Sequence, residues 1–167
     1  QKLNVIDLDI DFLAGSGHKL CGPTGIGFLW SRKEILEKIP PLFGGGEMIQ
    51  DVFEETSTWA ELPHKFEAGT PAIAEAIGLA EAINYINNIG LKEINEYEKN
   101  ITKYLFKKLN QIENIEVIGP SPEIDPDRAS LATFYIKNIH SNDIAEILDS
   151  KGICIRSGHH CCQPLHR

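Results

Sequence analysis

The sequence lacks any apolar run that approaches the roughly eighteen residues of a membrane-spanning helix. It also lacks, at its amino end, the basic segment and apolar run of a secretory signal peptide. There is no excess of positive charge, because 16 Lys and Arg stand against 24 Asp and Glu, for a net charge of −8. Nucleic-acid binders need clustered positive charge to displace phosphate counterions. We therefore expect a soluble protein with neither membrane nor nucleic acid as partner, in the cytoplasm or alternatively in a plastid stroma or similar organelle.

Cysteine is scarce and unevenly placed. The four cysteines are Cys21, Cys154, Cys161 and Cys162. Three of them fall within nine residues, and two are adjacent and follow His159 and His160. This is not the spacing of a disulfide framework, so it indicates a reducing compartment. The cluster predicts either thiol chemistry or metal binding.

The first thirty residues predict two strands joined by a small-residue loop. Apolar and polar residues alternate over 3–10, which predicts a strand, and residues 12–17 continue into a loop. A short apolar run over 26–30 suits a buried strand. Lys19 is expected in the connection between the two strands.

Helices are expected next, on either side of an aperiodic segment. Ser31 can cap a short helix over 32–39, which two prolines end. After a long stretch of little periodicity, apolar residues recur every three or four positions from Pro71, behind a Thr70 cap. Gly90 interrupts this pattern before a second amphipathic helix begins.

The last third of the chain predicts a small α+β domain. Two β-like segments, 115–118 and 131–136, are followed by a helix over about 142–150. An alternating segment over 153–156 is predicted as a third strand that delivers the His-Cys segment. The expected order is strand, strand, helix, strand.

Lys19 is the first candidate for chemistry. It follows Ser16, Gly17 and His18, so its amine emerges from a glycine-containing turn beside a hydroxyl and an imidazole. Such a set suits a lysine that binds a phosphorylated aldehyde covalently, with its neighbours at the phosphate. A solvated loop lysine of no special role is the competing interpretation.

The segment 156–166 is the second candidate and allows three interpretations. A thiol beside two imidazoles and near the Arg156 guanidinium favours the thiolate that a nucleophile requires, and Gly158 lets a loop present it. Zinc could instead be bound by the two cysteines and up to three histidines, His166 included. Adjacent cysteines cannot easily face one ion, so we expect no metal here. A partly buried cysteine without chemical role remains the third interpretation.

Four motifs, in this order and spacing, resemble those of the SufS-type (group II) cysteine desulfurases of the class V aminotransferase family. They are 16–27 around Lys19, 44–49 with its three glycines, 66–71, and 156–161 ending at Cys161. The resemblance covers the whole chain and corresponds to the carboxyl-terminal portion of the family. It implies an α/β fold that is part of the pyridoxal-phosphate (PLP) dependent transferase fold type I. The chain would comprise the end of the large α/β domain and a small α+β domain.

By the same resemblance, we expect three parts in the chain. Residues 1–88 would complete the PLP-binding large domain and carry a dimer-facing loop, 89–112 would form a connecting helix, and 113–167 would carry the catalytic loop. The family works as a homodimer. The cofactor-binding residues it implies are Lys19, which holds PLP covalently and moves the α-proton of the substrate, with Ser16 and His18 at the phosphate and Thr70 at the phosphate of the partner subunit.

The resemblance also implies the reaction, which converts L-cysteine to L-alanine and leaves a persulfide on Cys161. His160 would manage thiol protons, and Arg156 is the only candidate here to bind the substrate carboxylate. A sulfur-acceptor protein and iron–sulfur cluster assembly would follow, with selenocysteine lyase or a zinc-binding interaction module as alternatives. Because several cofactor contacts of the family lie outside this sequence, we expect the chain alone to bind PLP weakly and to be inactive.

Overall fold

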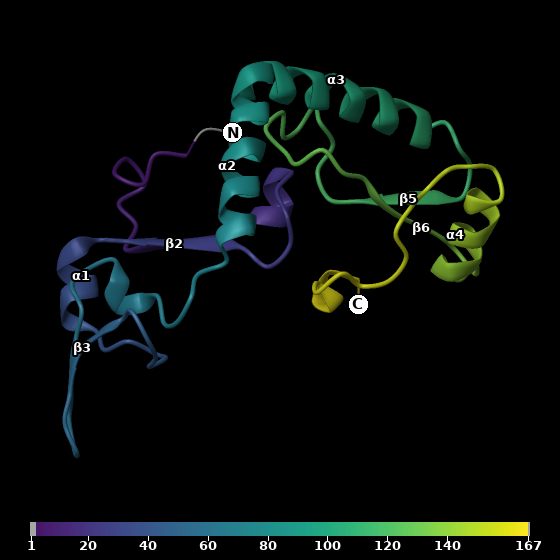
Figure 1. The fold of residues 1–167 in the computed structure, drawn as a ribbon. Helices are drawn as coiled ribbons and strands as arrows, with labels where there is room; N and C mark the ends of the chain where they lie inside the picture. The colour runs from purple at the N-terminus through teal and green to yellow at the C-terminus, as the bar shows by residue number, and fades with distance from the viewer. Residues whose placement is uncertain (1–2, 167) are drawn as a thin grey trace. The chain divides into compact units, whose positions relative to one another are not determined.

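The computed structural model describes residues 3–166 and forms two compact units, Gln1–Glu93 and Ile94–Arg167. Helix and strand are mixed along the chain, as the α/β prediction requires (Figure 1). The boundary between the units falls inside a helix at residues 93 and 94. The expected three-part division at residues 88 and 112 stays a prediction.

The first unit begins with an antiparallel pair on either side of the Lys19 segment. Strand β1 (Phe12–Ser16) pairs with β2 (Gly27–Ser31), with Phe12 opposite Ser31 and Ser16 opposite Gly27. A 3₁₀ turn, η1 (Gly17–Leu20), follows β1 directly. The expected strand over 26–30 is confirmed, although Phe28 and Leu29 are exposed in it rather than buried. Lys19 lies between two strands as expected, but the first of them is β1, where the loop expected over 12–17 is wrong.

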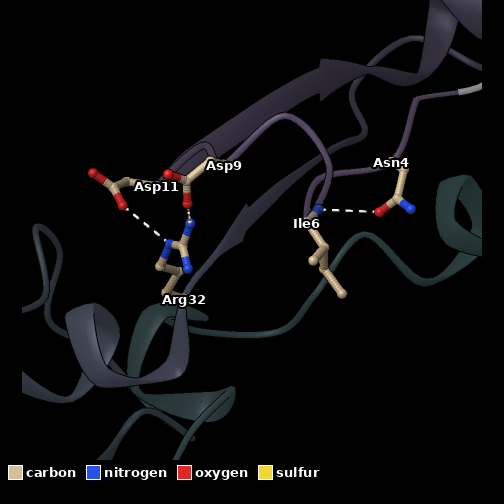
Figure 2. Close-up of polar contacts among 5 residues, drawn as sticks. All are labelled: Asn4, Ile6, Asp9, Asp11 and Arg32. Carbon is tan, nitrogen blue, oxygen red and sulfur yellow. Dashed lines mark hydrogen bonds and ion pairs between the residues drawn. The ribbon is translucent and has the colours of Figure 1, made fainter.

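The strand expected over 3–10 is wrong, because these residues form turns. The Asn4 side chain accepts a hydrogen bond from the backbone of Ile6 at 3.0 Å (Figure 2). The Leu8 amide donates to the Asn4 carbonyl at 3.1 Å. Asp9 has a φ of 49°. Short polar side chains that bond their own backbone compete with ladder formation, so the alternating pattern forms no strand here.

Arg32 connects the segment before β1 to the end of β2. Its guanidinium donates to Asp9 at 2.5 Å and to Asp11 at 3.1 Å (Figure 2). Helix α1 (Lys33–Lys38) starts after Arg32, and the expected Ser31 cap is wrong. Ser31 is instead buried, and its Oγ finds no hydrogen-bond partner among the described residues.

The carboxyl end of α1 is capped from a distance by Lys65, in η2 (His64–Phe66). Its ammonium donates to the carbonyls of Leu36 at 2.9 Å and Glu37 at 3.1 Å, and the residue is buried. Free carbonyls and the negative end of the helix dipole both favour a cation there. This contact fixes α1 against the segment that leads to Thr70.

The stretch expected to be aperiodic contains a short hairpin. Strand β3 (Ile49–Val52) pairs antiparallel with β4 (Ser57–Trp59), with a register shift between Ile49 and Asp51. The sequence of this stretch shows little periodicity, so the hairpin was not predicted.

Two long helices follow, as the periodicity predicts. Helix α2 (Ile73–Ile89) ends at Gly90, whose φ of 96° is reached most easily by glycine, and α3 (Leu91–Leu109) begins at once (Figure 1). The Thr70 cap is wrong, because the N-cap is Ala72 and its end carries no side-chain cap.

The second unit pairs β5 (Ile115–Ile118) with β6 (Thr133–Ile136), antiparallel, and continues into α4 (Ser141–Asp149) and the 3₁₀ turn η3 (Gln163–His166). These strands and the helix are confirmed. The strand over 153–156 is wrong. No strand of the described residues pairs with it, and the Ile153 amide instead donates to Leu148 at the end of α4. A strand needs a neighbour for its backbone groups.

The loop between β5 and β6 contacts α3 through two side chains, Arg128 and Asp127. Arg128 places its guanidinium 4.3 Å from the Phe106 ring centroid and donates to the carbonyls of Pro120 and, at 2.9 Å, Leu131. Asp127 accepts a hydrogen bond from the Lys99 ammonium at 2.7 Å. This bond, with the nearby positive charge, lowers the pKa of Asp127 below its ordinary value.

Candidate functional site

The Lys19 amine is presented at the surface by η1. Ser16, His18 and Lys19 are all exposed, and within residues 3–166 their side chains make no hydrogen bond or ion pair. The turn ends at Cys21, whose φ of 59° reverses the chain and whose amide donates back to Gly17. The structure therefore brings the three predicted residues together on one turn with their polar atoms available.

Gly17 closes this turn against Ile26, the residue that precedes β2. Its amide donates to the Ile26 carbonyl at 2.8 Å, and its own carbonyl accepts from Gly22 at 3.0 Å. A Cβ at Gly17 would lie 2.8 Å from Ile26 Cγ2 and 2.9 Å from the Ile26 oxygen, so a larger residue does not fit. The position of Lys19 depends on this absence of a side chain.

Helix α2 supports the same turn from the other side. A Cβ at Gly22 would lie 3.0 Å from Leu79 Cδ1, and one at Gly78 would lie 3.2 Å from Pro23 Cγ. Leu79 is buried. Sequence reasoning missed Gly78, although an isolated glycine inside a helical pattern is a signal of close packing.

The second and third motifs are also brought together. The Gly69 amide donates to the Gly46 carbonyl at 2.9 Å, and Met48, fully buried, accepts from Ala60 at 2.9 Å. Thr70 follows this contact and is exposed, with no hydrogen bond from its side chain within the described part of the chain. It is thus available to a group outside this chain.

The cysteine segment forms a tight turn with unusual backbone angles. Gly158 has a φ of 113°, and His160 and Cys161 follow with 46° and 64°. Left-handed conformations are uncommon for residues other than glycine and cost about 1 kcal/mol or more each. The turn leaves Cys161 and His160 exposed, whereas Cys162 is half-buried.

Arg156 lies ahead of this turn and is exposed, without a hydrogen bond or ion pair to any residue of the described range. Among the described residues, no three His, Cys, Asp or Glu side chains are grouped so that they could hold a metal ion. The His166 side chain, named above as a possible ligand, lies outside what the structure describes. The described helices include none that is both long and apolar enough to cross a membrane.

The residues around Lys19 fit PLP. A surface amine suits the aldehyde, and a hydroxyl and an imidazole on the same turn suit the phosphate. Neither Ser16, His18 nor Lys19 is committed to another partner in residues 3–166, and the Gly17 contacts hold the turn that carries all three.

Known proteins match this chain over nearly its whole length. A protein of Synechocystis sp. named "Probable cysteine desulfurase" is 54% identical over 165 residues, which cover 99% of this chain and 39% of that protein. The apo cysteine desulfurase of Thermococcus onnurineus NA1 matches with a TM-score of 0.88 and 41% identity, over 97% of this chain and 40% of its own.

A more distant structure is the cystine C–S lyase C-DES in complex with its reaction product, cysteine persulfide. It matches with a TM-score of 0.75 and 27% identity, over 92% of this chain and 40% of its own. The chain thus spans about two fifths of the length of the proteins it matches. The family model for Aminotransferase class-V matches residues 1–167, so the chain belongs to the class V aminotransferase family.

Proposed function

We propose that this chain is part of a PLP-dependent cysteine desulfurase, which removes sulfur from L-cysteine and leaves L-alanine. The observation that carries the proposal is the exposed Cys161 thiol on its strained turn. Membership of the class V family accounts for a PLP-binding lysine but not for a thiol. Similarity to proteins named cysteine desulfurase supports the same conclusion.

In this proposal, Lys19 holds the cofactor through its amine, Ser16 and His18 bind its phosphate, and Thr70 reaches the phosphate in a partner subunit. PLP supplies an electron sink for the negative charge that develops at the substrate α-carbon. The Lys19 amine moves the α-proton. Exposure of these side chains, with no competing partner among residues 3–166, supports these roles.

The second unit supplies the sulfur chemistry. The Cys161 thiolate attacks the substrate sulfur as the substrate Cβ–S bond breaks, so that the sulfur stays on Cys161 as a persulfide. The electron pair of the broken bond remains with the carbon fragment, which takes up protons and leaves as alanine, and His160, adjacent on the same turn, handles the thiol protons. Arg156 pairs with the substrate carboxylate.

The biological setting is part of the proposal. We place the protein among the SufS-type enzymes, as a homodimer that passes sulfur to an acceptor protein for iron–sulfur cluster assembly. The four cysteines, Cys21, Cys154, Cys161 and Cys162, form no disulfide, which supports a reducing compartment, the cytoplasm or a plastid stroma.

The test uses the whole protein that contains this chain, loaded with PLP and given L-cysteine. Cys161→Ser should lower alanine production by roughly a hundredfold or more, as loss of a nucleophile does. It should also remove the added sulfur atom that mass spectrometry finds on the 157–163 peptide. Cys154→Ser is the matched control and should leave both unchanged. Undiminished alanine release from Cys161→Ser would contradict the proposal.

A further inference from the structure

The two adjacent cysteines are presented differently. Cys161 is exposed, whereas Cys162 is half-buried, and its thiol donates a hydrogen bond to the His159 carbonyl at 3.0 Å. The backbone amide of Cys162 donates to the same oxygen at 2.9 Å. One carbonyl is therefore bound by both the main chain and the side chain of Cys162.

These two bonds close the turn over the residues between them. His160 and Cys161, which lie between donor and acceptor, both have left-handed backbone angles. Such angles persist where the surrounding structure enforces them. Any residue at 162 could donate its amide, but only one with a side-chain donor of this reach can supply the second bond. The thiol is a weak donor that serves this purpose.

We propose that Cys162 is a positioning residue for Cys161: its thiol closes the turn and holds the Cys161 thiol outward, and it is not a second sulfur carrier. The inference rests on the proposed role of Cys161. If Cys162 instead relayed sulfur from Cys161 to an acceptor, its thiol would have to attack the persulfide on Cys161. That sulfur is directed at the loop's own backbone and is half-buried, so a relay would first have to break the bond that shapes the turn.

The first test maps thiol reactivity in the whole protein without substrate. Brief treatment with iodoacetamide, followed by mass spectrometry of the 157–163 peptide, should modify Cys161 about tenfold faster than Cys162, because thiol reactivity depends on access. Equal modification of the two thiols would overturn the inference, as would a persulfide located on Cys162 after addition of L-cysteine.

The second test separates the hydrogen bond from the side-chain volume. Cys162→Ala should speed hydrogen–deuterium exchange of the 157–163 peptide and lower kcat for cysteine several-fold with little change in KM, since substrate binding does not use this thiol. Cys162→Ser keeps a donor and should restore both values toward wild type. Cys154→Ala, at an exposed thiol outside the turn, is the control.

The outcomes distinguish this inference from the proposed function. If Cys162→Ala behaves as wild type in exchange and kcat while Cys161 still forms a persulfide, the positioning role fails and the desulfurase proposal stands. Cys161 could instead form no persulfide while hydrogen–deuterium exchange is faster in Cys162→Ala and close to wild type in Cys162→Ser. In that case the desulfurase proposal fails and the turn-closing role of Cys162 remains.

Discussion

Gly17 shows how one missing side chain determines where a reactive amine can lie. The turn that carries Lys19 comes within hydrogen-bonding distance of Ile26, the residue before β2, and the contact is made by Gly17. The Ile26 carbonyl that limits this space also accepts the Gly17 amide. A larger residue would therefore force apart the two segments that this hydrogen bond joins.

We expect Gly17→Ala to destabilise the protein by about 1–3 kcal/mol, as overpacking of a close contact does. It should also weaken PLP binding, because the turn that carries Lys19 must shift. Thermal unfolding and titration of the cofactor absorbance measure the two effects. Gly44→Ala is the matched control, since its added Cβ would meet no atom within 4 Å. Equal behaviour of the two variants would show that the Gly17 contact does not constrain the turn.

At the candidate site, the sequence predicted which residues lie on loops better than it predicted their backbone angles. The small residues around Lys19 and Cys161 predict loops, and both lie on turns. The left-handed angle at Cys161 was not foreseeable and that at His160 only weakly so, because residue type favours such angles at glycine and, less strongly, at Asn, Asp and His. The inward thiol of Cys162 follows from those angles and so was beyond sequence reasoning as well.

At the scale of elements, the long periodic segments were all predicted, whereas the short ones were predicted unevenly: β2, β5 and β6 were expected, but β1, β3 and β4 were not. The helices α2 and α3 repeat their pattern over several turns, and both were predicted with the break at Gly90. Alternation over 3–10 and 153–156 is equally regular, but strands form only where a neighbour supplies hydrogen bonds. That neighbour is a tertiary property, which the local pattern does not contain.

The contact between α3 and the loop before β6 should make stability depend on pH. The Lys99 bond lowers the pKa of Asp127 from its ordinary 3.8 in the folded state. Stabilisation from a depressed carboxyl pKa is present above the unfolded value and is lost as pH falls through the folded value. Asp127→Asn should therefore lower the melting temperature near neutral pH and have progressively less effect below pH 3.8.

A double-mutant cycle with Lys99→Met checks the assignment. If the pair accounts for the effect, the two changes together should cost less than the sum of the single changes near neutral pH. If Asp127→Asn lowered the melting temperature equally at all pH values, or if the two changes were fully additive, the Lys99–Asp127 pair would not be the source of the stabilisation.

At the scale of the whole molecule, the chain exposes more surface than compact proteins of its size. Its accessible area is 13,209 Å². A compact monomer of this length exposes roughly 8,000 Å², and two separate domains of these sizes would expose only about 10,000 Å². Much of the surface is apolar, including Leu42 at 87% exposed and Ile77 at 68%. The difference of about 3,000 Å², counted on this chain alone, exceeds the roughly 800 Å² that each partner buries in a standard interface.

We therefore expect the 167-residue chain, produced alone, to bind a hydrophobic dye and to self-associate, because its many exposed apolar side chains favour both. It should release no sustained alanine from L-cysteine and show no stable PLP absorbance band, since the chain spans only 39% of its matched relative and the turn proposed to bind PLP is open to solvent. Dye fluorescence, size-exclusion chromatography and alanine assay test this, with the whole protein as reference. Sustained turnover by the chain alone, or a cofactor band that Lys19→Ala abolishes, would mean that these residues build a sufficient cofactor site by themselves.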